Sequence, residues 1–81
     1  MKRNETLYET AKFYKNKNIS VHINLVSGDW LNGKIKNISK DRLILDEERY
    51  GEMLILFARI LDDGIKPREE KNGKKQKNNL K

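Results

Sequence analysis

The stretch Ile23–Leu45, INLVSGDWLNGKIKNISKDRLIL, alternates apolar and polar residues in three segments that two short turns separate. Side chains that alternate with a period of two lie on opposite faces of a β-strand, so each segment is predicted to be a half-buried strand. The turns fall at residues 27–29 and 39–41, and their Ser-Gly-Asp and Ser-Lys-Asp sequences favour tight reversals. The stretch therefore predicts a meander of antiparallel strands.

Gly33 stands inside the second of these strands, among residues that face the predicted core. A glycine in a strand interior marks strong curvature or the close approach of another backbone. Small barrels need such bends, so we expect the meander to curl into a barrel.

Downstream of the meander, the segment Met53–Phe57 is apolar at every position. Such a strand is buried on both faces, or it is covered on one side by a neighbouring subunit. We favour a subunit contact in so small a domain, and we expect a fifth strand to start at Ile60 and to be interrupted at residues 62–64. The residues predicted to form the oligomer interface are Met53, Ile55, Phe57 and Ile60.

Upstream of the meander, residues 5–16 have the features of a helix. Leu7, Ala11 and Tyr14 follow the i, i+4, i+7 spacing of one helix face. This stripe is too narrow to hold a free helix in water, so the helix must pack against the strands. The predicted fold class is mainly β, with an N-terminal α-helix followed by a five-stranded, strongly bent antiparallel small barrel.

The chain of 81 residues is long enough for one domain, which we place at residues 1–67. Residues 68–81 show no periodicity and are predicted to form a basic, disordered tail. The net charge is +6, divided as +3 over residues 1–20, −1 over residues 21–66 and +4 over residues 67–81. A near-neutral centre with basic ends suggests a folded body that meets nucleic acid. The alternative is that the Lys and Asn residues simply keep the chain soluble.

Several classes of function have little support in this composition. The chain has no cysteine and one histidine, and it contains no phosphate-binding glycine loop, so we expect no enzyme, cofactor or metal. It also lacks a long apolar run and an N-terminal signal segment, so we expect a soluble, cytoplasmic protein with no membrane partner. Because disulfide and metal staples are absent, oligomerisation is the remaining way to bury more apolar surface.

A short helix followed by five bent strands, with glycine in the first hairpin and in the second strand, resembles the Sm-like (Lsm) family over residues 5–66. The resemblance implies a protein that binds single-stranded RNA. It also implies a homo-oligomeric ring, a hexamer or heptamer, in which the fourth strand of one subunit pairs with the fifth of the next. The positions that carry the family's first motif are Leu25, Gly28, Gly33, Ile35, Ile38, Leu43, Ile44 and Leu45.

The resemblance assigns RNA binding to two loops. Ser39 stands where the family's first motif has Asp, Arg42 stands where it has Asn, and residues 57–59 replace the second motif, Ile-Arg-Gly. Cationic side chains in such loops can contact phosphate, and aromatic rings can stack on bases. In the alternative, Phe57 belongs to the core and the charges are solvated turn residues. The predicted RNA-binding residues are Ser39, Lys40, Arg42, Phe57 and Arg59.

Other conspicuous side chains have two explanations each. Trp30 lies on a polar strand face, so it either stacks on a single strand or packs under the helix or at a subunit contact, which we favour. His22 either contacts RNA or is an ordinary strand-surface residue. The acidic cluster at residues 46–48 and Glu52 can perform acid-base work, although protection of a strand edge explains it better.

Two further functions compete with RNA binding. The first is a Sm-like or SH3-like barrel that serves as a structural or protein-interaction module without nucleic acid, because small barrels share much of this pattern. The second is a small barrel that binds DNA.

Overall fold

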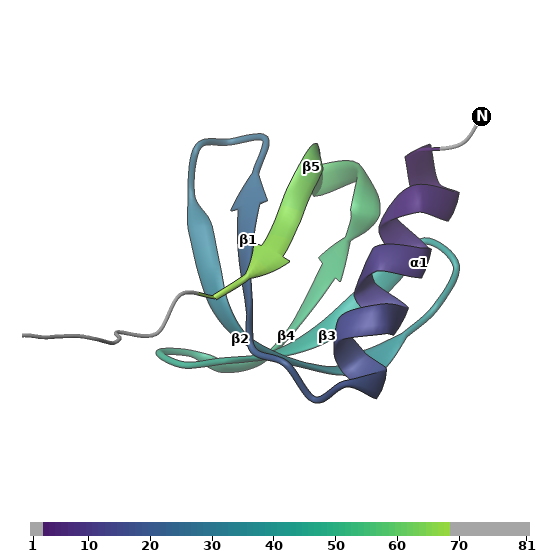
Figure 1. Cartoon of the computed structure of the whole chain (residues 1–81). Helices are drawn as coiled ribbons and strands as arrows, with labels where there is room; N and C mark the ends of the chain where they lie inside the picture. Colours follow the sequence, from purple (N-terminus) through teal and green to yellow (C-terminus); the bar gives the residue numbers. More distant parts are fainter. Residues whose placement is uncertain (1–2, 69–81) are drawn as a thin grey trace, which may run out of the picture.

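The computed structural model describes residues 3–68 of the chain (Figure 1). One helix is followed by five strands, with a single 3-10 turn before the last strand. In chain order the elements are α1 (Arg3–Asn16), β1 (Val21–Leu25), β2 (Trp30–Ile38), β3 (Arg42–Glu47), β4 (Gly51–Leu56), the 3-10 turn η1 (Phe57–Arg59) and β5 (Ile60–Pro67).

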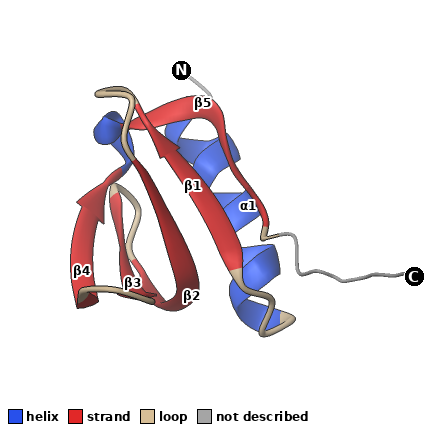
Figure 2. Cartoon of the chain, turned by 90° about the vertical axis from the view of Figure 1, so that its left-hand side faces the viewer, coloured by secondary structure: helices blue, strands red, loops and turns tan. Residues whose placement is uncertain are grey.

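The strands form one antiparallel sheet in the order β4-β3-β2-β1-β5. The sheet is strongly bent, and α1 lies along one side of it (Figures 1 and 2). This arrangement confirms the predicted fold class, an N-terminal helix followed by five bent antiparallel strands. Among residues 3–68 the outer edges of β4 and β5 pair with no strand, so the sheet does not close into a barrel.

The core lies between α1 and the concave side of the sheet. Leu7 and Ala11 on α1 are buried and Tyr14 packs against the core, as the predicted apolar stripe requires. Each strand places alternate side chains toward α1. The inward-facing strand residues are Val21, Ile23, Leu31, Ile35, Leu43, Leu45, Ile55, Ile60 and Ile65.

Two irregularities in the pairing accompany the bend of the sheet. The β2–β3 register shifts between Ile35 and Asn37, and the β1–β5 register shifts between Ile23 and Leu25. Bulges of this kind increase local twist and bend a strand. The interruption predicted at residues 62–64 lies at the second shift, so it is a bulge within a continuous β5.

Arg68, the last residue that the structure describes, lies just past the predicted end of the domain at residue 67. The Arg68 backbone N–H donates to the Ser20 carbonyl oxygen at 2.9 Å, so this residue belongs to the fold rather than to the predicted tail. The rest of that tail, residues 69–81, is outside the described residues. Between residues 3 and 68, no helix has the length and apolar character that crossing a bilayer requires.

Gly33 lies where the backbone of the neighbouring strand β3 approaches closely. It pairs with Val21 on β1 and with Glu47 on β3, and a Cβ added here would overlap the Asp46 carbonyl. The predicted role of this glycine, close backbone approach within a bent strand, is therefore what the structure shows.

We predict that Gly33→Ala destabilises the fold by about 1–3 kcal/mol, the usual cost of overpacking, because the neighbouring strand must move. Chemical denaturation measures this cost. Lys34→Ala is the control, since Lys34 is the next residue on the same strand and its side chain is exposed. A Gly33→Ala variant that is as stable as the wild type would contradict the prediction.

Candidate nucleic-acid interface

The two loops that the sequence assigned to RNA binding meet at one end of the sheet. The β2–β3 turn contacts η1 through a hydrogen bond of 2.9 Å, in which the Phe57 N–H donates to the Asp41 carbonyl oxygen. Lys40, Arg42 and Arg59 are exposed on these loops, and Ser39 lies exposed at the start of the turn. The structure therefore brings the four polar residues of the predicted site to neighbouring loops.

Phe57, the fifth residue of that predicted site, lies elsewhere. Its ring is 0% exposed and belongs to the core, so it offers no face to a base in this structure. The prediction that Phe57 stacks on RNA is wrong for this conformation, and the alternative, that it is a core residue, is correct. Its burial follows from its position at the end of β4, where the chain turns inward over α1.

The residues predicted for an oligomer interface also face inward. Ile55 and Ile60 are core residues like Phe57, and Met53 packs against the core. The apolar side chains of β4 that reach solvent are the alternate ones, Leu54 and Leu56, which are 55% and 40% exposed. The apolar surface of β4 is therefore formed by different side chains from those predicted.

The β2–β3 turn carries less free positive charge than its sequence suggests. Arg42 donates to Asp41 from Nε at 2.9 Å and from Nη2 at 3.3 Å. These hydrogen bonds lower the pKa of Asp41, so the pair stays ionised. A hollow of about 540 Å³ beside the turn is lined by further carboxylates, Glu5 and Glu9 on α1, together with Lys40. Lys40 and Arg59 are left as the exposed cations of this end.

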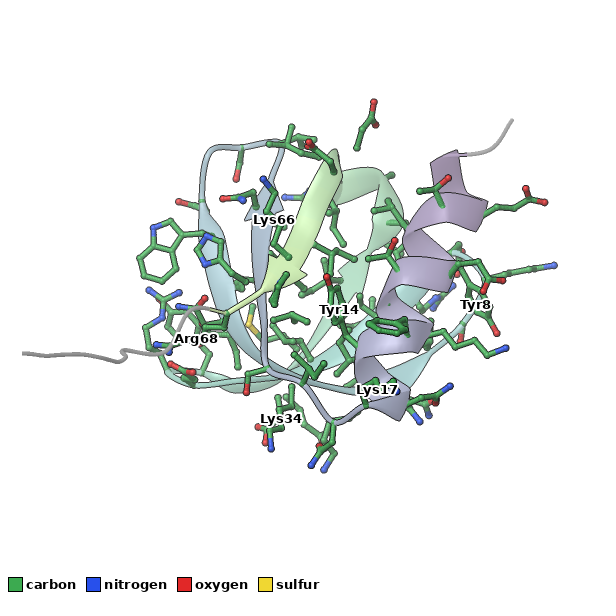
Figure 3. All side chains as sticks on the ribbon, viewed as in Figure 1. Tyr8, Tyr14, Lys17, Lys34, Lys66 and Arg68 are labelled. Carbon is green, nitrogen blue, oxygen red and sulfur yellow. The ribbon has the colours of Figure 1, made fainter. Side chains whose placement is uncertain are left out.

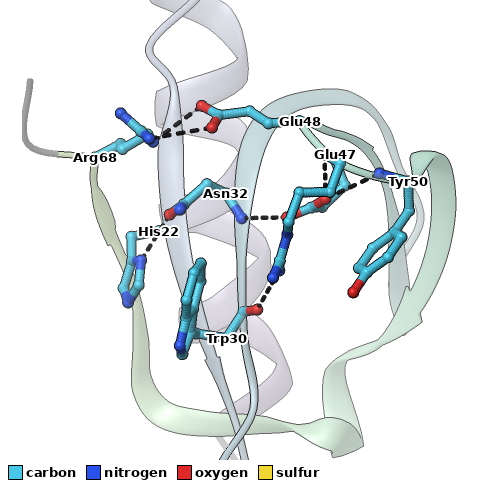
Figure 4. Close-up of polar contacts among 8 residues, drawn as sticks. His22, Trp30, Asn32, Glu47, Glu48, Tyr50 and Arg68 are labelled. Atoms are coloured by element: carbon cyan, nitrogen blue, oxygen red, sulfur yellow. Dashed lines mark hydrogen bonds and ion pairs between the residues drawn. The ribbon is translucent and has the colours of Figure 1, made fainter.

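A second polar surface covers the outer face of the sheet, on the side away from α1 (Figure 3). Trp30 is 46% exposed there, and its ring stacks on His22 with centroids 5.7 Å apart and planes at 28° (Figure 4). The favoured prediction, that Trp30 packs under the helix or at a subunit contact, is therefore wrong as regards the helix. His22 lies on the strand surface, as expected, but it is part of an aromatic stack.

Arg49 extends this stack toward the β3–β4 turn. Its guanidinium carbon is 4.4 Å from the Trp30 ring centroid and 4.8 Å from that of Tyr50. Its Nη2 also donates to the Trp30 carbonyl oxygen at 3.0 Å. Sequence reasoning missed Arg49 and Tyr50, because no periodic pattern relates a turn residue to a side chain 19 positions earlier. The outer-face stack consists of His22, Trp30, Arg49 and Tyr50.

Glu47 holds Arg49 in this position from inside the fold. The carboxylate is 2% exposed, and it accepts hydrogen bonds from the Arg49 side chain at 3.1 and 3.2 Å. It also accepts from the backbone N–H groups of Asn32, Arg49 and Tyr50 at 3.0, 2.6 and 3.1 Å. The interpretation of Glu47 as an exposed strand-edge charge is therefore wrong. The sequence contained one signal for this burial, because Glu47 falls on the same face of β3 as the buried Leu43 and Leu45.

Burial alone would raise the pKa of Glu47, but the hydrogen bonds outweigh it. The N–H groups of Asn32, Arg49 and Tyr50 and the Arg49 guanidinium all favour the ionised form, and they lower the pKa from 4.5 to about 2. Glu47 is thus a structural anion at neutral pH. It is not a proton donor or acceptor for chemistry.

His22 has a second polar neighbour on the outer face. Its Nδ1 lies 2.6 Å from the Asn32 Oδ1, and since that oxygen can only accept, Nδ1 carries the proton. Beside them, Arg68 forms an ion pair with Glu48 at 2.9 Å between Nε and Oε2, which ties the end of β5 to the β3–β4 turn (Figure 4). A hollow of about 400 Å³ lies in this region, lined by His22, Asn32, Lys66, Pro67 and Arg68.

Comparison with known proteins identifies no family for this chain. No protein-family model matches the chain, and no curated protein matches it. In the part of the chain that the structure describes, no group of three or more His, Cys, Asp or Glu side chains is placed to hold a metal ion.

We predict that Glu47→Gln lowers the free energy of unfolding at pH 7 by about 3 kcal/mol, because the new amide places N–H groups against buried donors. The folded pKa lies below the unfolded value, so this stabilisation is complete above about pH 4.5 and is lost as the pH falls toward 2. Urea denaturation of both proteins between pH 2 and 7 should show the difference shrinking across that window.

Glu52→Gln is the matched control for this prediction. The Glu52 carboxylate is 64% exposed and lies 3.6 Å from Lys36, so its loss should cost less than about 0.5 kcal/mol. Equal free energies of unfolding for the Glu47→Gln and Glu52→Gln variants at pH 7 would show that the buried carboxylate does not stabilise the fold.

Proposed function

We propose that the chain is an Sm-like protein that assembles into a homo-oligomeric ring, a hexamer or heptamer, and binds single-stranded RNA through the loops at one end of each subunit. The sequence resemblance and the observed strand order support this proposal together. The protein acts as a binding module, and its proposed place is in RNA metabolism.

The observation that carries the proposal is the pair of open sheet edges. β4 and β5 lie at opposite ends of the strand order, and no strand among residues 3–68 pairs with the outer edge of either one. Both edge strands also carry exposed leucines, Leu54 and Leu56 on β4 and Leu61 on β5. Open apolar edges promote association unless something covers them. Pairing β4 of one copy with β5 of the next covers both kinds of edge in a head-to-tail contact, and such contacts form a ring when the rotation between neighbouring copies closes.

The loop geometry supports RNA as the ligand of such a ring. The hydrogen bond between the β2–β3 turn and η1 puts Lys40 and Arg59 on neighbouring loops of the same subunit. A ring repeats this pair of cations around its axis. Repeated cations suit the regularly spaced phosphates of a single strand.

A second candidate is a ring or oligomer that serves as a protein-interaction module without RNA. The ion pair between Asp41 and Arg42 favours it, as do the carboxylates of Glu5 and Glu9 in the adjoining hollow. These groups reduce the positive potential at the predicted RNA site. The RNA experiment below separates the two candidates.

For assembly, we predict that Leu54→Asp converts the ring to smaller species while the subunit stays folded. Leu54 is 55% exposed, so a charge here costs the isolated subunit little but blocks an apolar contact at the β4 edge. Trp30→Asp is the control, because Trp30 is 46% exposed on β2, the middle strand of the sheet, and not on either edge strand. Light scattering on the size-exclusion peak measures the mass, and circular dichroism checks folding. A Leu54→Asp variant with the wild-type mass would contradict edge assembly.

For binding, we predict that Lys40→Ala combined with Arg59→Ala weakens the affinity for a short oligouridine about tenfold, more than deletion of residues 69–81 does, because these are the exposed cations of the two loops. Lys12→Ala with Lys15→Ala removes the same charge from α1 and serves as the control. Fluorescence anisotropy with labelled oligouridine and mixed-sequence RNA at physiological salt measures both. If only the deletion weakens binding, the loops are not the site, and if no RNA binds, the protein-interaction candidate gains support.

A further inference from the structure

Three side chains form a row across the outer face of the sheet. Asn32 on β2 and Lys66 on β5 are both Cα partners of His22 on β1. Side chains of directly paired residues in antiparallel strands lie on the same face and within reach of one another. The three groups of the row, an amide, an imidazole and an ammonium, therefore stand side by side over three adjacent strands.

The His22 ring is held at both its edge and one of its faces. The hydrogen bond with Asn32 fixes its edge, and Trp30 stacks on one face. The hollow of about 400 Å³ is lined by His22 and Asn32 but not by Trp30. The pairing register puts Trp30 opposite Asn24, whereas Pro67 is opposite Val21, so the indole and the hollow lie to either side of His22 along β1. His22 thus lies between the indole and an open hollow.

We propose that this hollow binds a single nucleotide, with its base stacked on His22 and its phosphate beside Lys66. The proposal goes beyond the RNA function proposed above, because it requires neither a ring nor the residues of the β2–β3 turn. The shared ligand chemistry is an aromatic base that carries a phosphate, supplied either as a free nucleotide or as one unit of a single strand.

The stack already formed on the outer face favours a planar ligand. A base stacked on His22, on the side away from Trp30, would extend the outer-face stack of His22, Trp30, Arg49 and Tyr50 by one more ring. Base stacking on aromatic rings is a large part of single-strand binding and tolerates any base. The imidazole is pre-oriented by its two neighbours, so little conformational entropy is lost when a base arrives.

The polar groups of the hollow suit the rest of a nucleotide. Because the Asn32 Oδ1 accepts from His22, its Nδ2 group is left as a donor, and residues 3–68 offer it no acceptor. It can donate to a ring nitrogen or carbonyl at the edge of a base. Lys66 is exposed and forms no ion pair within the described chain, so its ammonium is available to a phosphate.

Charge and size restrict the ligand further. Arg68 also lines the hollow, but its guanidinium is neutralised by Glu48 at 2.9 and 3.1 Å, so the phosphate is assigned to Lys66. Small-molecule pockets usually measure about 300–1,000 Å³. At about 400 Å³, this hollow is large enough for one nucleotide.

The test is a titration of the full-length, ¹⁵N-labelled chain with AMP and, separately, with hexa-adenylate, followed by NMR. We expect shifts of the backbone amides of His22, Asn32 and Lys66 and of the Trp30 indole N–H. His22→Ala should weaken binding at least about fivefold, and His22→Phe, which keeps a flat ring, should restore most of it. Lys66→Ala should weaken binding and lower its salt dependence, whereas Lys34→Ala, outside the hollow, should not.

Each outcome decides the proposal or the source of the ligand. Loss of binding in the His22→Ala and Lys66→Ala variants supports the pocket, with AMP binding identifying a free nucleotide and binding of hexa-adenylate alone identifying a unit of a strand. Absence of shifts at the three amides with both ligands, or unchanged affinity in the His22→Ala variant, overturns it. Lys40→Ala with Arg59→Ala should leave AMP binding unchanged, so the failure of either proposal is seen separately.

Discussion

The buried carboxylate of Glu47 is the constraint on which the outer surface of this small fold depends. A charge taken out of water costs several kcal/mol unless hydrogen bonds replace its hydration. Here three backbone N–H groups and one guanidinium do so, and they come from β2 and from the β3–β4 turn. The same bonds fix Arg49, which lies between Trp30 and Tyr50. The buried anion therefore fixes the arginine against which the rings of Trp30 and Tyr50 pack.

The elements of the fold could be predicted because their signals are local. The alternation of apolar and polar residues over Ile23–Leu45 predicts strands, and the apolar stripe on residues 5–16 predicts a helix. Neither prediction needs knowledge of residues far away in the sequence. The outer-face stack has no such signal, since it depends on the pairing register that puts His22 opposite Asn32 and on a turn 19 residues after Trp30. Glu47 had a local signal, its phase with the apolar residues of β3, but its charge suggested the surface.

The segment Met53–Phe57 shows why a uniformly apolar strand is hard to interpret. Alternation still applies to it, but a sequence in which every residue is apolar does not show which face is the core. The structure places Ile55 inward and leaves Leu54 and Leu56 exposed. The informative residues for assembly are consequently the ones left outside, because the inward ones are already used to bury the core of a single subunit.

The ion pairs show which of the positive charges of the chain are neutralised within the fold and which remain exposed. Arg42, Arg49 and Arg68 each pair with a carboxylate, at Asp41, Glu47 and Glu48 respectively. A guanidinium fork matches a carboxylate in two places, so arginine is suited to such fixed structural contacts. Lys40, Arg59 and Lys66, in contrast, are exposed and form no ion pair within residues 3–68. The positive charge that the two proposed sites leave for a polyanion therefore lies on these three side chains, whereas the paired arginines keep the loops and the stack in place.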